Sequence, residues 1–228
     1  MIPVARLASD PNPLLKWSYV TGQWDDIQAD LVAHFQLTVS AVLAGLVISS
    51  LLAAIALRHG WALGPITGFT GFLFTLPSVA LYAALVPVTG YTKLTAFIPL
   101  TAYTLLILVT AIVAGFRSVP SAVRDAADGM GLTPARRVLT VELPLAVPYI
   151  ITGVRVATVT TVGLVTVAAI IGQGALGDLI LDGLKRTYWT PMTVGATLSV
   201  ALALVLDLTI YLVGRALTPW TRRGRASA

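Results

Sequence analysis

The chain contains 228 residues, of which 57% are hydrophobic and 11% charged, and its mean hydropathy is +0.86. Soluble domains carry roughly 25% charged residues, so this composition predicts an integral membrane protein. The sequence has no cysteine, which excludes disulfides, thiolate metal sites and thiol nucleophiles. The net charge of +5 does not indicate nucleic-acid binding, because the basic residues lie in short segments between apolar runs instead of on one basic face.

Residues 1–30 are expected to form a polar lead-in to the first span. Four aspartates outnumber Arg6 and Lys16 in this stretch, and Trp17 and Trp24 suit a membrane interface. We therefore expect a short interfacial helix or turn here.

Five stretches are apolar enough to cross a membrane, which takes about 20 residues of helix. They are residues 31–57, 66–88 with a kink at Pro77, 94–116, about 145–171 and about 192–214. The predicted fold is therefore all-α, with about five transmembrane helices.

The loops predict the orientation, because lysine and arginine are retained on the cytoplasmic side. If residues 117–144 are cytoplasmic, that side holds nine basic residues and the other side five, with Arg155 left inside a span. We therefore expect an extracytoplasmic lead-in at 1–30, a transmembrane domain at 31–216 and a basic cytoplasmic tail at 217–228.

A charged segment, RDAADGMGLTPARRVLTVELP at 124–144, separates the third and fourth spans. Pro120 suits the first turn of a helix, and Gly129 and Gly131 would stop that helix. Thr133 and Pro134 are typical of the start of a second short helix, and Pro144 is placed where the chain turns back into the bilayer. The first helix has a small apolar face: Val119, Ala122, Val123, Ala126, Ala127 and Met130.

This small apolar face favours close approach to a partner protein, as small residues do at helix contacts. The alternative is a loop that rests on lipid headgroups, for which Trp, Phe or Leu would be typical. In the second short helix, Ala135, Val138 and Leu139 are expected to point inward.

Two ionisable residues lie inside apolar runs and are candidates for function. Arg155 and Asp207 either form an ion pair across the fourth and fifth spans or occupy separate polar sites. Tyr82 and Tyr103 are candidates to line a path for a quaternary ammonium solute through cation–π contact, although aromatic residues near span ends are often interface residues.

One motif in the charged segment resembles a known family. Asp125, Ala126 and Ala127, then Gly131, Val141, Leu143 and Pro144, have the spacing of the EAA loop in permeases of binding-protein-dependent ABC importers. Asp125 replaces the usual glutamate and Val141 the usual isoleucine. The resemblance implies the type I importer permease fold and a loop at 117–144 whose coupling helix binds a cytoplasmic ATPase subunit.

Further blocks at 75–90, 124–159 and 168–180 resemble permeases that import glycine betaine, choline, carnitine or proline. The resemblance implies three protein partners: ABC ATPase subunits, a second permease chain that is identical or paralogous, and an extracytoplasmic substrate-binding protein. The chain lacks a GxxxxGK[ST] loop for ATP, and GQGALG at 172–177 follows a membrane span without the strand context of a dinucleotide site. We expect no cofactor, no metal and no catalytic residues.

Two other classes of function are compatible with a polytopic chain. A stand-alone secondary carrier or channel would typically show internal repeats, but five spans do not divide into equal halves. An intramembrane enzyme would need a catalytic group of residues, and the two histidines, both toward the ends of the first span, supply none.

Overall fold

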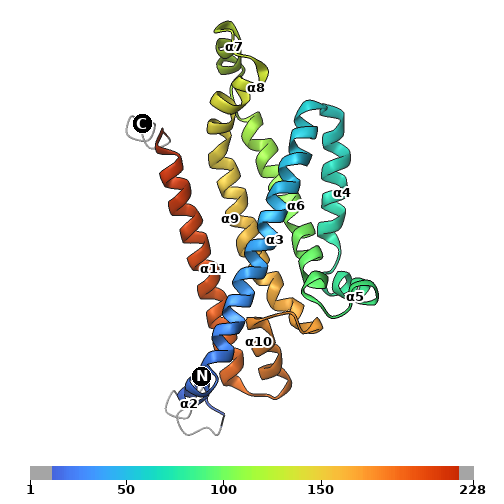
Figure 1. Cartoon of the computed structure of the whole chain (residues 1–228), viewed down its shortest axis with the longest axis vertical. Coiled ribbons are helices and arrows are strands. Elements are labelled where there is room, and N and C mark those ends of the chain that lie inside the picture. The colour runs from blue at the N-terminus through green and yellow to red at the C-terminus, as the bar shows by residue number, and fades with distance from the viewer. Residues whose placement is uncertain (1–11, 221–228) are drawn as a thin grey trace, which may run out of the picture. The chain divides into compact units, whose positions relative to one another are not determined.

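The computed structural model describes residues 12–220, which form helices with no strand among them (Figure 1). The part of the predicted lead-in before Asn12 and the part of the predicted basic tail after Trp220 lie outside the described residues. A short helix, α2 (Trp17–Gly22), lies in the lead-in, and the residues from Trp24 onward already belong to the first long helix.

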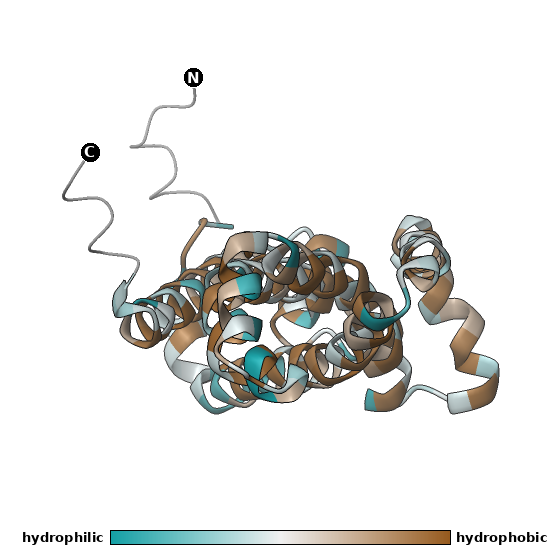
Figure 2. Cartoon of the chain, turned by 90° about the horizontal axis from the view of Figure 1, so that it is seen from above, coloured by the Kyte–Doolittle hydropathy of each residue, from teal (hydrophilic) through white to brown (hydrophobic). Residues whose placement is uncertain are grey.

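Four long helices match predicted spans within a few residues at most ends. They are α3 (Trp24–Arg58), α6 (Lys93–Arg117), α9 (Leu143–Val167) and α11 (Trp189–Leu217). Helix α3 begins seven residues before the predicted start at residue 31, because the aspartates of the lead-in join its first turns. Acidic residues are favourable there, since the N-terminal end of a helix carries partial positive charge. Apolar residues cover most of the helical ribbon (Figure 2).

The second predicted span is broken instead of kinked. A 3-10 turn, η1 (Gly60–Ala62), leads into α4 (Leu63–Thr75), and a separate helix, α5 (Ser78–Thr89), follows. Pro77 has an extended backbone, φ −60° and ψ 128°, so it caps α5 and ends the helical path from α4. Among the described residues, four helices are long and apolar enough to span a membrane, with a fifth span if α4 and α5 are counted together.

The chain forms two compact units. Unit 1 contains the residues up to Ala41, Leu76–Thr101 and Val159–Val205. Its core packs Tyr82 and Leu100 against Val165 and Ile171. The end of α9 also accepts two side-chain hydrogen bonds: Tyr82 donates to the carbonyl of Leu164 at 3.1 Å, and His34 Nε2 contacts the carbonyl of Val162 at 3.1 Å.

Glycines shape the segment of unit 1 that follows α9. A 3-10 turn, η3 (Ala168–Ile171), ends at Gly172, whose φ of +68° is in the left-handed region that favours glycine. Helix α10 (Leu176–Lys185) then packs so closely that a Cβ on Gly177 would collide with the backbone of Thr166. The glycines of the GQGALG segment thus let the chain turn away from the fourth span.

Unit 2 contains Val42–Thr75, Ala102–Thr158 and the residues from Leu206 onward. Its core brings Ala53 and Ala56 against Val109, Ile112 and Val113. Small residues bring its helices close together, because a Cβ on Gly153 would collide with Ala111. The helices of the charged segment, α7 (Ser121–Gly129) and α8 (Pro134–Arg137), also belong to unit 2.

Candidate functional site

The segment between α6 and α9 forms two short helices, as the sequence predicts. Helix α7 starts after Pro120, which is its extended N-cap and not a residue of its first turn. Gly131 has a φ of +77°, so the chain reverses at a position where a side chain would be strained. Thr133 then caps α8, since its hydroxyl accepts a hydrogen bond from the backbone N–H of Arg136.

The predicted turn at Pro144 is wrong, because α8 continues into the fourth span without a break. Helix α8 widens into a π-helical turn, η2 (Val138–Glu142), and α9 begins at Leu143. Proline cannot donate to the residue four positions earlier, and its ring clashes with the carbonyl there. That residue is Thr140, which lies inside the wider turn, so the π-helix accommodates Pro144 in a continuous helix.

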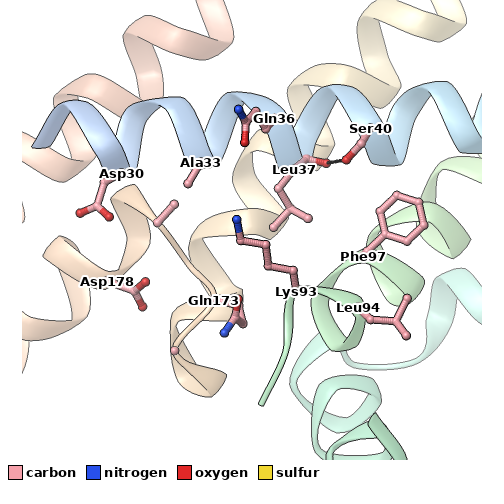
Figure 3. A pocket seen from close by; sticks show the side chains of 12 residues that line it. Asp30, Ala33, Gln36, Leu37, Ser40, Lys93, Leu94, Phe97, Gln173 and Asp178 are labelled. Carbon is pink, nitrogen blue, oxygen red and sulfur yellow. Dashed lines mark hydrogen bonds between the residues drawn. The ribbon is translucent and has the colours of Figure 1, made fainter. Parts of the chain in front are cut away.

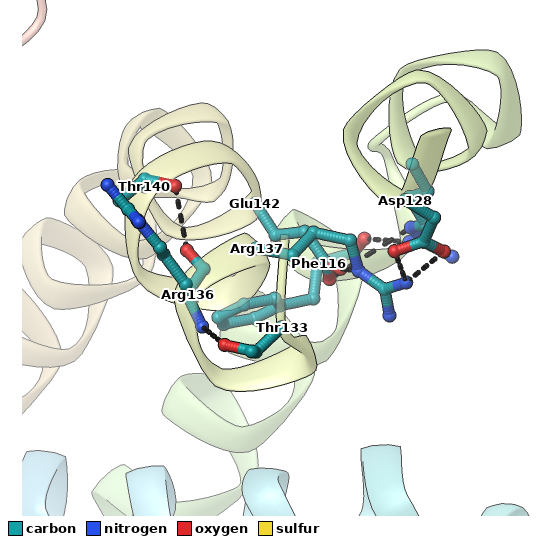
Figure 4. A network of polar contacts seen from close by, with 8 residues as sticks. Phe116, Asp128, Thr133, Arg136, Arg137, Thr140 and Glu142 are labelled. Carbon is teal, nitrogen blue, oxygen red and sulfur yellow. Dashed lines mark hydrogen bonds and ion pairs between the residues drawn. The ribbon is translucent and has the colours of Figure 1, made fainter. Parts of the chain in front are cut away.

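Four charged residues join the parts of this segment, and we call them the loop latch: Arg124, Asp128, Arg137 and Glu142. Figure 4 labels Asp128, Arg137 and Glu142. Arg137 donates to Glu142 at 2.8 Å and to Asp128 at 2.6 Å. Arg124 lies 3.9 Å from Glu142 and donates to the carbonyl of Phe116, the penultimate residue of α6, at 2.6 Å. The latch therefore connects α7 to both flanking spans.

This latch was not predicted, and only part of its signal can be read from the sequence. Arg124 and Asp128 are four residues apart and share one face of α7, and Glu142 follows Arg137 by five residues. Glu142 is only 7% exposed, and a buried carboxylate needs a cationic partner. The Arg137–Glu142 contact depends on the π-helical turn between these residues, because residues five apart do not share a face of an α-helix.

The residues of the EAA-like motif divide into two sets by exposure. Asp125, Ala126 and Gly131 are exposed, whereas Val141, Leu143 and Pro144 are partly buried. Ala127 is 1% exposed and packs within unit 2, so it does not share the outward face with Ala126. Two large apolar side chains do lie outward on this segment: Met130 is 73% exposed and Leu139, which was expected to point inward, is 65% exposed. Ala135 was also expected inward and is exposed.

Arg155 and Asp207 form the ion pair that the sequence suggested. The guanidinium donates to both carboxylate oxygens, at 2.8 Å and 2.7 Å, from α9 to α11 within unit 2. The Arg155 guanidinium also lies 5.1 Å from the ring centre of Tyr211. This geometry explains how two charges are tolerated inside apolar spans, since each neutralises the other.

The two tyrosines proposed for a solute path are both buried. Tyr82 is 0% exposed in the core of unit 1 and its hydroxyl is bonded to Leu164. Tyr103 is 4% exposed and contacts Phe74 edge-on in unit 2, with ring centres 5.9 Å apart. Neither ring offers a face to a solute in this conformation. The described residues contain no group of three His, Cys, Asp or Glu side chains placed to hold a metal.

Residues 45–223 match the family described as binding-protein-dependent transport system inner membrane components. The match covers the loop latch, the EAA-like motif and the ion pair. The chain belongs to this family. It is therefore a multi-pass inner-membrane component of a transport system, which favours a transport subunit over a stand-alone carrier or an enzyme.

Curated relatives cover most of the chain. The choline transport system permease protein OpuBB of Bacillus subtilis (strain 168) is 35% identical over 187 residues, which span 82% of this chain and 86% of the relative. The osmoprotectant import permease protein OsmW of Salmonella typhimurium (strain LT2) is 34% identical over 191 residues, 82% of this chain and 89% of the relative.

Solved structures share the fold. The inward-facing MetNI methionine ABC transporter matches with a TM-score of 0.71 at 20% identity, over 90% of this chain and all of the other. An amino acid ABC transporter crystallised with histidines matches with a TM-score of 0.73 at 15% identity, over 89% of this chain and 99% of the other. These likenesses establish the type I importer permease fold that the EAA-like motif implied.

Proposed function

We propose that this chain is the permease subunit of an ATP-driven importer for small osmoprotectants such as glycine betaine, choline, carnitine or proline. The observation that carries this proposal is the similarity, over 82% of the chain, to permeases named for choline and osmoprotectant import. In this proposal the transmembrane domain is 31–216 and cytoplasmic ABC ATPase subunits bind the loop at 117–144. A second permease chain completes the path, and an extracytoplasmic binding protein delivers the solute.

The outward side of the loop is the proposed contact with the ATPase. Its face combines the small side chains of Ala122 and Ala126 with the exposed side chains of Asp125, Met130 and Leu139. Small residues allow a partner's backbone to approach closely, and large apolar side chains gain free energy when a partner covers them. Gly131 supports this face by making the reversal between α7 and α8.

The loop latch gives a route by which ATPase motion reaches the membrane. Arg124 ties α7 to the end of α6 through Phe116, and Asp128 ties α7 through Arg137 to the continuous helix that leads into α9. A displacement of α7 is thus carried to two spans at once, as in shear motions of packed helices. The remaining motif residues, Val141, Leu143 and Pro144, act in this proposal by joining the loop to α9.

Orientation follows from this assignment. A loop that binds a cytoplasmic ATPase must be cytoplasmic, which agrees with the excess of basic residues on that side. The N-terminus then lies outside and the basic tail lies in the cytoplasm.

Co-purification of the tagged protein in mild detergent tests the proposal, with Ala126→Arg compared with Ala126→Ser. We expect an ABC ATPase with wild type and with Ala126→Ser, and its loss with Ala126→Arg, because a long charged side chain blocks close approach. The exposed position of Ala126 keeps this a test of docking, whereas a change at the buried Ala127 would test packing. Uptake of labelled glycine betaine and choline should fall in parallel.

Two outcomes would contradict the proposal. If the ATPase stays bound to Ala126→Arg at the wild-type level and uptake is intact, the outward loop face is not the contact with the ATPase. A wild-type protein without any ATPase, under conditions that preserve a known importer complex, would favour a stand-alone carrier.

A further inference from the structure

Unit 1 contains a cavity of about 520 Å³, and no residue of the loop at 117–144 lines it. Its walls come from α3, the start of α6, the glycine-rich turn after η3 and the start of α10. The polar and aromatic lining residues are Asp30, Gln36, Lys93, Phe97, Gln173 and Asp178. We call this space the unit 1 cavity. In the view of Figure 3, Asp30 and Asp178 lie toward one end, Phe97 toward the other, and Lys93 between them.

The charged groups of this cavity form no salt bridge among the described residues. Within residues 12–220, no salt bridge joins Asp30, Lys93 or Asp178 to another side chain, whereas the neighbouring Asp182 pairs with Arg186 at 2.7 Å. Two carboxylates and one amino group therefore line one space without a salt bridge to any described side chain, which leaves their charges available to a ligand.

The cavity wall holds its groups in place. Asp178 accepts hydrogen bonds from the backbone N–H groups of Gly174 and Ala175, and burial raises the pKa of its carboxyl. Gln173 donates to the carbonyl of Tyr91 at 3.2 Å, which ties the glycine-rich turn to the residues just before α6. Lys93 is the first residue of α6. The backbone thus sets the position of the Asp178 carboxylate and the point at which the flexible side chain of Lys93 enters the cavity.

We infer that the unit 1 cavity is a transit site for a small zwitterionic solute. The solute's quaternary ammonium lies near Asp30 and Asp178, and its carboxylate lies near Lys93. Methyl groups on a quaternary ammonium are weakly hydrated, so the apolar side chain of Ala33, which lies beside Asp30 in Figure 3, suits them. This inference rests on the proposed function for the solute class and adds a site within the permease itself.

The charge pattern also favours a zwitterion over a simple ion. A simple anion would be repelled by two carboxylates, and a simple cation would find Lys93 without a counter-charge. A zwitterion satisfies both signs at once, so the cavity should prefer glycine betaine to choline, which carries no carboxylate.

Equilibrium binding to the purified permease–ATPase complex in nanodiscs, without the binding protein, tests the inference. The probe is radiolabelled glycine betaine, with choline as competitor. Lys93→Met and Asp178→Asn should each weaken binding of the probe by about tenfold or more, the effect of one lost charged contact. Lys93→Arg should restore most of it, and Lys93→Met should leave choline competition unchanged or stronger.

Matched controls come from the same helices. Asp182→Asn on α10 and Asp25→Asn on α3 remove carboxylates that do not line the cavity, so both should bind the probe as wild type does. Lys93 is exposed at a helix start, which keeps the test valid even if Asp178→Asn folds poorly.

Failure of the inference and failure of the proposed function can be told apart. If the wild-type complex with its binding protein imports glycine betaine, but the probe does not bind or the cavity variants bind it as wild type does, the cavity is not a transit site. Equal weakening in the cavity variants and the controls would also overturn it. If the wild-type complex imports none of the osmoprotectants, the proposed substrate class is wrong.

Discussion

The loop latch and the unit 1 cavity use the same residue types in opposite ways. In the latch, Arg137 and Glu142 meet at 2.8 Å and each charge is neutralised within the chain. In the cavity, Lys93 and Asp178 both line an open space without pairing. The latch fixes the shape of the loop, because its charged groups are already paired with each other. The cavity can select a solute, because its charged groups are not paired within the chain.

This difference gives a rule for charges in an apolar chain. A charge that has its partner in the same chain is part of the scaffold, and its loss should damage assembly of the protein. A charge without a partner is available to a ligand, and its loss should change affinity while the protein still assembles. Substitutions at the two kinds of site should therefore fail in different assays.

The largest effect is expected at Arg155 and Asp207, because this pair of opposite charges lies inside the membrane spans. Asp207→Arg places two guanidinium groups together in an apolar span, where one charge costs about 3 kcal/mol on insertion scales. That cost corresponds to a loss of folded protein on the order of a hundredfold. Membrane-fraction immunoblots and size-exclusion profiles measure it.

The double variant Arg155→Asp with Asp207→Arg is the control for this pair. It restores opposite charges at the two positions, so expression should recover most of the way to wild type. A double variant as poorly expressed as the single ones would mean that the pair does not stabilise the protein through its charges.

Removing Glu142 breaks the latch and should give the next largest effect. Glu142→Ala leaves Arg124 and Arg137 without their shared carboxylate, and a lost partner of a charged hydrogen bond costs about 1–3 kcal/mol. We expect ATPase co-purification and uptake to fall by about tenfold, while the protein remains in the membrane. Limited proteolysis should cut the loop faster.

Glu142→Gln keeps hydrogen-bonding capacity and should fall between the wild type and Glu142→Ala. Wild-type docking by Glu142→Ala would show that the loop keeps its shape without the latch.

The apolar pattern of the sequence was enough to predict the long helices. Helix α6 was expected at 94–116 and observed at Lys93–Arg117, because charged residues flank that apolar run on both sides. At Pro77 the same pattern misled, since hydropathy does not record whether a proline kinks a helix or ends it. The π-helical turn before Pro144 was missed for a related reason, because this proline was expected to mark a turn and not to lie within a continuous helix.

The site was predictable in position but not in orientation. The motif spacing located the loop, and helical periodicity grouped Ala126 with Ala127. Adjacent helical residues point about 100° apart, and only the packing of α7 decides that Ala127 is buried while Ala126 is exposed. The unit 1 cavity was out of reach, because Asp30, Lys93 and Asp178 lie far apart in the sequence and meet only through the fold.

A smaller effect is expected at the turn that orients the loop face. Gly131 has a φ of +77°, and a residue with a Cβ there costs about 1–2 kcal/mol. Gly131→Ala should lower ATPase co-purification through this strain alone, since a Cβ at this position meets no other atom within 4 Å.

Gly129→Ala is the matched control, because Gly129 ends α7 without a positive φ and also has open space around it. It should dock as wild type does. An equal loss in both variants would mean that the loop face requires bare backbone at the contact, and not only the turn.

The smallest effect should appear in the pH dependence of solute binding to the unit 1 cavity. Burial raises the pKa of Asp178, so this carboxylate takes up a proton before an exposed aspartate does as the pH falls. The protonated form no longer attracts an ammonium, and glycine betaine binding should therefore weaken as the pH falls.

The other charged groups near Asp178 are Asp30 on α3, Lys93 on α6 and Lys185 on α10, and the lysines keep their charge throughout this range. Asp178→Asn should flatten the profile in part, leaving the contribution of Asp30, whereas Asp182→Asn should follow the wild-type curve. Binding by Asp178→Asn with an unchanged pH profile would place the titrating group elsewhere and weaken the assignment of Asp178 to the ammonium.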